Sequence, residues 1–100
     1  MNNHNFSQGE IIYNNFNIDF DVPFEQQKDE LLEDLLQIKF SNDYLIDLGW
    51  YPECDITGKF VLYLIKNENW QNPVYKHSCN KKNELIMSFD IAIGIINKQK

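Results

Sequence analysis

The chain has 100 residues, an apolar fraction of 43% and a net charge of −6. This length supports a single domain, residues 1–100, and the aliphatic and aromatic content is enough to fill one core, which excludes a largely disordered chain. An acidic chain without arginine is poorly suited to phosphate, so we expect no nucleic-acid binding. No apolar run approaches the roughly 18 residues of a membrane span, so we expect no membrane segment.

The charge is unevenly distributed along the chain. Residues 1–58 hold twelve acids and two lysines, a net charge of −10, whereas residues 59–100 hold seven lysines and three acids, a net charge of +4. Seven of the acids lie between Asp19 and Asp34. Such a field attracts basic proteins or cations.

The N-terminal residues are polar. Residues 1–9 are expected to be disordered, and MNNHNFSQGE has neither the basic region nor the apolar core of a secretory signal, so the expected location is the cytoplasm. Glu10–Tyr13 and Phe16–Phe20 show partial period-2 alternation, which predicts one or two short strands. Whether residues 10–20 join a sheet is left open.

An acidic helix is predicted next. Pro23 suits a helix start, and Leu31, Leu32, Leu35 and Leu36 have helical spacing, so the helix is expected to run from Phe24 to about Ile38 or Lys39. Its opposite face would carry Asp29, Glu30, Glu33 and Asp34. These acids are either a solvated helix surface or a binding face.

Three strands are predicted after this helix. Tyr44–Tyr51 alternates, Lys59–Lys66 is apolar on both faces as in a central strand, and Pro73–Cys79 is more polar. The short connections between them are of hairpin length, so the sheet is predicted to be an antiparallel meander.

The chain ends in a predicted apolar helix. Asn80 is a plausible N-cap, and two helical stripes follow: Leu85, Phe89, Ala92, Ile93 and Ile96, then Ile86, Met87, Ile91 and Ile95. A helix that is apolar nearly all round is either wrapped by the core or meets another chain. The predicted fold is α+β, a meander of three or more strands flanked by an N-terminal acidic helix and a C-terminal apolar helix.

The residues that could carry chemistry are sparse. Cys54 and Cys79 are either unrelated free thiols or a redox pair at one rim of the sheet, and no cysteine or histidine spacing fits a metal site. His77 and Cys79 are two positions apart on a strand, about 6.5 Å, which is too far for an activated nucleophile. We therefore expect no enzymatic activity, no cofactor and no metal.

The stretch DLGWYPECDITGKF, Asp47–Phe60, can be interpreted in two ways. Trp50 belongs to the face of Tyr44, Ile46 and Leu48 and is predicted to be core, and Pro52–Gly58 forms the hairpin connection. Tyr51 shares the opposite face with Asp47, beside Glu53 and Asp55. The stretch is therefore either a well-made hairpin or a docking rim in which an aromatic anchor is surrounded by acids.

A resemblance covers roughly the C-terminal half of the chain. The motifs Gly49-Trp50-Tyr51-Pro52-Glu53, Asp55-Ile56-Thr57-Gly58, Phe60-Val61-Leu62 and Trp70-Gln71-Asn72-Pro73, followed by a terminal helix, resemble immunity proteins of bacterial contact-dependent growth inhibition systems. The resemblance implies that the partner is a cognate toxin, the C-terminal domain of a large exported protein and often a nuclease such as an RNase. It assigns no interface residue.

Charge suggests how such a protein would act. A nuclease active site is basic because it binds phosphates, so an acidic protein could block it by tight stoichiometric binding. The expected partner-binding residues are Glu30, Glu33, Asp34, Asp47, Tyr51, Glu53 and Asp55. The alternative is a self-associating structural or regulatory module, a homodimer through the helix Leu85–Ile96. The identity of the toxin and whether its active site or an exosite is covered are left open.

Overall fold

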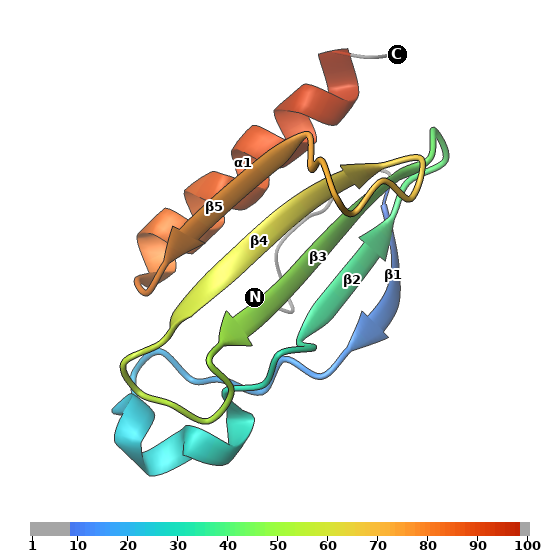
Figure 1. The fold of residues 1–100 in the computed structure, drawn as a ribbon. Helices are drawn as coiled ribbons and strands as arrows, with labels where there is room; N and C mark the ends of the chain where they lie inside the picture. Colours follow the sequence, from blue (N-terminus) through green and yellow to red (C-terminus); the bar gives the residue numbers. More distant parts are fainter. Residues whose placement is uncertain (1–8, 99–100) are drawn as a thin grey trace.

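Residues 9–98 are described by the computed structural model, which shows one antiparallel sheet and one long helix (Figure 1). The strand order is β1-β2-β3-β4-β5. The strands are β1 (Glu10–Asn14), β2 (Leu36–Lys39), β3 (Tyr44–Tyr51), β4 (Lys59–Lys66) and β5 (Tyr75–Cys79), with a 3-10 helix η1 (Phe24–Glu30) and the helix α1 (Lys82–Lys98). The expected disorder of residues 1–9 falls, except for Gly9, outside the described range.

The predicted antiparallel meander of three or more strands is confirmed, with five strands. β3 and β4 pair over eight residues each, and β4 is central as predicted, with β5 on its other side. The last strand begins at Tyr75 rather than at Pro73. Two further strands extend the sheet, because β1 pairs with β2 through a bulge between Ile11 and Tyr13, and β2 pairs with β3.

One face of the sheet holds the core, and α1 covers it where β4 and β5 lie (Figure 1). The predicted face of β3 is fully inside, with Trp50 at its end. Phe60 lies at the centre of an aromatic group that includes an edge-on contact with Trp50, with ring centroids 4.9 Å apart. Phe16, Phe20 and Phe24 also contact the Phe60 ring. Phe16–Phe20, expected as a strand, is therefore a loop whose aromatic side chains fill the core.

The predicted acidic helix is wrong. Only Phe24–Glu30 is helical between the loop and β2, as a 3-10 helix that is kinked at Gln27. Residues 31–35, here called the extended segment, lead into β2 without helical turns and with a bend at Glu33. The four leucines at positions 31, 32, 35 and 36 fit a helical spacing, but the burial of Leu36, Ile38 and Phe40 follows period 2. The last part of the predicted helix is therefore a strand.

Hydrogen bonds to other segments explain this outcome. The Gln27 side chain accepts a bond from the backbone N–H of Asp19 (2.9 Å) and donates to the carbonyls of Asp19 and Val22, which ties η1 to the preceding loop. The extended segment bonds to β3, since Leu35 N–H donates to the Leu48 carbonyl and Trp50 N–H donates to the Leu32 carbonyl. Backbone groups satisfied by the sheet are no longer available to a helix, and tertiary pairing overrides the local pattern.

The C-terminal helix is confirmed, with a different start. α1 begins at Lys82, and Leu85 N–H donates to the Lys81 carbonyl, so the N-cap position is Lys81 rather than Asn80. The first predicted stripe is buried at Leu85, Phe89, Ala92 and Ile96. The second stripe is partly outside the core. No helix among residues 9–98 is long and apolar enough to cross a bilayer.

Gly49 fixes the approach of the extended segment to β3. A Cβ at this position would overlap the Glu33 carbonyl oxygen and would lie 2.9 Å from Cε2 of Tyr51. The obstacle is backbone, which has little freedom to move. Only glycine therefore lets residues 31–35 pass over β3 at this point.

We expect Gly49→Ala to lower the free energy of unfolding by about 1–3 kcal/mol, because the added methyl group forces the Glu33 backbone away from β3. Urea denaturation measures the change. Gly94→Ala is the matched control: a Cβ at Gly94, within α1, meets nothing within 4 Å, so alanine should raise stability by about 0.5–1 kcal/mol. Equal effects of the two substitutions would contradict the close approach at Gly49.

Candidate partner-binding surface

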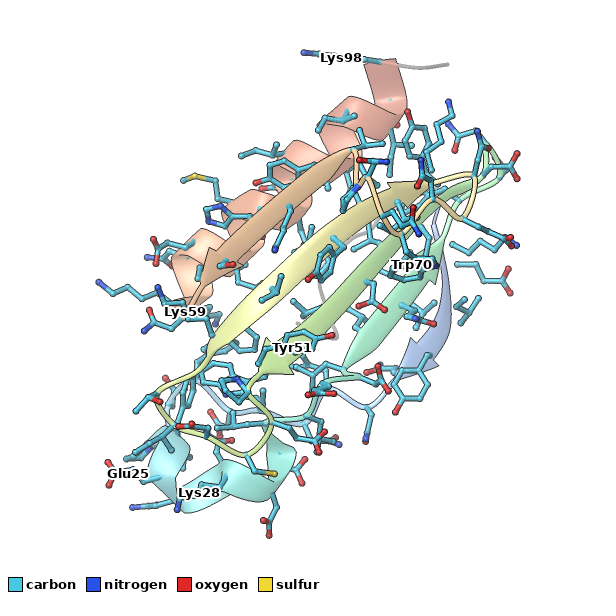
Figure 2. All side chains as sticks on the ribbon, viewed as in Figure 1. Glu25, Lys28, Tyr51, Lys59, Trp70 and Lys98 are labelled. Carbon is cyan, nitrogen blue, oxygen red and sulfur yellow. The ribbon has the colours of Figure 1, made fainter. Side chains whose placement is uncertain are left out.

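The sheet face opposite the core is the open face. The register places Asp47 next to Gln37 on one side and Tyr63 on the other, and the same row continues to Tyr13 and Lys76 at the two edges. The β4–β5 connection with Trp70 lies over one end of this face (Figure 2), and the Glu33 backbone lies against it at Gly49. A row of polar and aromatic side chains on a sheet face that α1 does not cover is a surface suited to a protein partner.

The acids predicted as binding residues gather at one end of the open face. The Glu53 carboxylate accepts a hydrogen bond from the Glu33 backbone N–H (3.0 Å), which joins the extended segment to the β3–β4 connection. The charges of Glu33 and Asp34 both act on the phenol of Tyr51. The structure thus brings together an acidic rim, defined here as Glu33, Asp34, Asp47 and Glu53 beside Tyr51.

Two of the predicted residues stand apart from this rim. Glu30 ends η1, which lies beyond the lower end of β3 in Figure 1. Asp55 is occupied by its own turn, where its carboxylate accepts bonds from the backbone N–H (2.9 Å) and the hydroxyl (2.7 Å) of Thr57. These bonds lower the pKa of Asp55, with a smaller contribution from the charge of Lys28. The Asp55 carbonyl also accepts a hydrogen bond from the indole N–H of Trp50 (2.8 Å), so the bonds of Asp55 stabilise the β3–β4 hairpin connection.

Asp47 is the one buried carboxylate among residues 9–98. Its exposed fraction is 6%, and its Oδ2 accepts a hydrogen bond from the side-chain amide of Gln37 (2.6 Å). Burial raises the pKa of Asp47, the bond from Gln37 opposes this, and the charge of Asp34 adds to the rise. The Gln37 amide thus stabilises the charged form of Asp47, whereas burial and the charge of Asp34 destabilise it.

The pKa of Tyr51 is shifted by the same surroundings. Burial, then the nearby groups Asp47, Tyr63, Asp34 and Glu33, raise the pKa of Tyr51 to about 12. The phenol therefore remains a neutral hydrogen-bond donor throughout the physiological range. A half-buried tyrosine with a polar tip among acids has the properties of a binding anchor.

A shallow groove of about 700 Å³ continues the open face toward its other end. Its walls include Ile12, Leu45 and Trp70, with Lys39, Asp43 and Glu68 among the polar residues. Trp70 is 48% exposed and is the largest exposed apolar side chain of the described range. It follows a turn in which Asn67 and Glu68 adopt positive φ angles of 54° and 60°. An exposed tryptophan beside a groove adds apolar anchoring to the acidic rim.

The structure also bears on the cysteines and on metal binding. Cys54 is exposed in the β3–β4 connection and Cys79 is buried, and both are free thiols. Burial raises the pKa of Cys79, which favours the unreactive thiol. The His77 ring stacks on Tyr75 with ring centroids 6.4 Å apart. Within residues 9–98, no group of three or more histidine, cysteine or acidic side chains is arranged to hold a metal ion.

Sequence reasoning missed several residues of this surface. Gln37 was assigned to a helix, so its place beside Asp47 depended on finding β2. Tyr63 was placed correctly on the face opposite Phe60, Leu62 and Leu64, but its pairing with Asp47 requires the strand register. Trp70 belongs to the motif Trp70-Gln71-Asn72-Pro73, but the motif does not show where the Trp70 side chain lies.

Comparisons of this chain with family models, curated proteins and solved structures gave no match. The functional argument therefore depends on the residues and geometry of the surface.

The buried carboxylate gives a test based on pH. We expect Asp47→Asn to raise the free energy of unfolding at neutral pH, because asparagine keeps an oxygen for Gln37 and removes a charge that burial disfavours. The folded-state pKa of Asp47 is raised above its ordinary value of 3.8. The folded wild type thus binds more protons than the unfolded chain between these two pKa values, and its stability falls as pH rises through them.

The advantage of Asp47→Asn should therefore be complete above the raised pKa and should vanish as pH falls toward 3.8. Urea denaturation of both proteins across this window measures it. Glu84→Gln, at an exposed acid in the first turn of α1, is the matched control. An advantage of Asp47→Asn that does not change with pH would contradict the burial of a charged carboxylate.

Proposed function

We propose that this protein is an immunity protein that neutralises a cognate toxin domain by stoichiometric binding, with the toxin most simply a nuclease. The observation that carries the proposal is the acidic rim around Tyr51. Acids from the extended segment, β3 and the β3–β4 connection lie at one end of the open face. A basic, phosphate-binding site is complementary to such a field.

Two features support protein binding at this surface over a purely solvated one. Tyr51 supplies a rigid aromatic side chain among the charges, as the anchors of protein interfaces do. The acids of η1 and the preceding loop extend the negative charge beyond the rim, as the lower part of Figure 2 shows near Glu25. Negative charge of this extent accelerates association with a basic partner, which suits a protein that must capture a toxin quickly.

The biological part of the proposal comes from the motifs Gly49–Glu53, Asp55–Gly58 and Trp70–Pro73, which resemble immunity proteins of contact-dependent growth inhibition. The structure gives these motifs local roles. Gly49 admits the extended segment, Gly58 lies where a Cβ would crowd the Tyr51 carbonyl (2.6 Å) and the Trp50 indole nitrogen (2.7 Å), and Trp70 lines the groove. The motif residues thus build or border the proposed binding surface.

Titration calorimetry with the toxin domain encoded beside this protein tests the proposal. We expect tight one-to-one binding that weakens with salt, because exposed charges contribute to it. The double variant Glu33→Gln/Asp34→Asn should weaken binding by about tenfold, while Glu84→Gln should leave it unchanged. Absence of binding would end the proposal. Tight binding that does not change with salt would support inhibition of the toxin but would place the interface on apolar surfaces.

Self-association is the second candidate, and exposed apolar residues of α1 favour it. Met87 is 61% exposed and Ile91, one turn later, is 45% exposed. Under the immunity proposal we expect the purified protein to sediment as a monomer, because two exposed side chains bury too little area for a stable dimer. A dimer that Met87→Lys/Ile91→Lys dissociates, together with no binding to the toxin domain, would favour the self-associating module.

A further inference from the structure

Asp47 is a buried carboxylate that receives no cation from its own chain. The groups that face it are Gln37 from β2, Asp34 from the extended segment, Tyr51 from β3 and Tyr63 from β4, together with the more distant charge of Glu33 near Tyr51. None of these is positively charged. Among the described residues, no lysine lies within salt-bridge distance of Asp47.

A structural role alone does not account for this carboxylate. Asparagine would accept the same bond from Gln37 without the cost of burying a charge. The lysine closest to it in the row, Lys76, has its Nζ over the Tyr63 ring, 5.4 Å from the ring centroid. Asp47 thus lies on the open face with its charge uncompensated, although Lys76 lies in the same row two strands away.

We propose that Asp47 receives an arginine side chain of the binding partner, which docks on the open face of the sheet with its guanidinium between Tyr51 and Tyr63. This rests on the proposed function and assigns the chemistry of the partner at that surface. The charge of Asp47 is complementary to a cation, and the planar guanidinium can bond to a carboxylate that already accepts one amide hydrogen. The two tyrosines provide ring surface for the guanidinium and its methylene stem.

Arginine fits this place better than lysine because the surroundings of Asp47 are aromatic as well as acidic. A guanidinium is more weakly hydrated than an ammonium group and stacks on rings, so its transfer to a half-buried place costs less. Gly49 lies between Asp47 and Tyr51 on the same face, and the space that a side chain would take there holds the Glu33 carbonyl oxygen and Cε2 of Tyr51.

Trp70 and the groove extend the docking surface beyond the arginine. Leu45 precedes Asp47 by two positions on the same face and lines the groove with Ile12 and Trp70. Apolar residues next to the partner's arginine would occupy this groove. The partner segment is thus basic at its centre and apolar on the side that faces Trp70.

Nuclear magnetic resonance with a small probe tests the inference without the toxin. The probe is N-acetyl-arginine amide, titrated into labelled protein, and its neutral isostere N-acetyl-citrulline amide is the control ligand. We expect the arginine compound to shift the amide signals of Asp47, Tyr51 and Tyr63, and the citrulline compound to leave them in place. Asp47→Asn should abolish the shifts, while Glu84→Gln, an acid-to-amide change on α1, should keep them.

Shifts that persist in Asp47→Asn, shifts confined to residues 19–30, or no shift at all would overturn the inference. Preserved signals elsewhere in the Asp47→Asn spectrum show that this variant is folded. Calorimetry with the toxin domain then separates the two proposals. Full toxin affinity in Asp47→Asn, with loss in Glu33→Gln/Asp34→Asn, would overturn the role of Asp47 and retain immunity. A loss of toxin affinity of about thirtyfold or more in Asp47→Asn would support both.

Discussion

The alternation of side chains along β3 connects the core of this protein to its candidate binding surface. Tyr44, Ile46, Leu48 and Trp50 point into the core, whereas Leu45, Asp47, Gly49 and Tyr51 belong to the open face. Because the side-chain period of a strand is two, a slip of one residue would exchange these sets and place a carboxylate in the core. Pairing with β4 over the full length of β3 prevents such a slip, so the same register that buries Trp50 also presents Asp47 and Tyr51.

The aromatic group around Phe60 holds residues 16–30, the acidic loop and η1, against the core. Phe16, Phe20 and Phe24 come from the loop and the start of η1, and each contacts the Phe60 ring, while Trp50 meets Phe24 edge-on at 5.2 Å. These apolar contacts hold a part of the chain whose charges repel one another. Burial of aromatic rings is strong enough to offset that repulsion because each ring removes a large area from water. The aromatic core thus holds in place the negatively charged residues that lie near the rim.

The open face combines features that have different energetic roles in binding. The exposed acids of the rim would steer a basic partner and would be screened by salt. Asp47 is buried, so its interaction with a partner cation would be screened less and would govern the lifetime of the complex. Trp70 and the groove would add apolar burial. On a surface of this kind, the exposed charges increase the association rate and the few buried groups provide selectivity for the partner.

The sequence by itself determined the strands β3 and β4, most of β5 and the buried stripe of α1. In each of these elements the apolar residues repeat with a clear strand or helix period, which can be recognised without knowing the neighbouring elements. It also placed Trp50 on the core face of β3 and Tyr51 with Asp47 on the opposite face. Only the tertiary structure decided the conformation of residues 24–39, where leucine spacing fitted a helix. The hydrogen bonds of Gln27 with the loop and of Leu35 with β3 resolved that ambiguity, and the resulting β2 placed Gln37 beside Asp47. The gathering of the acidic rim is likewise a tertiary result, since its residues come from three segments that meet only when the sheet has formed.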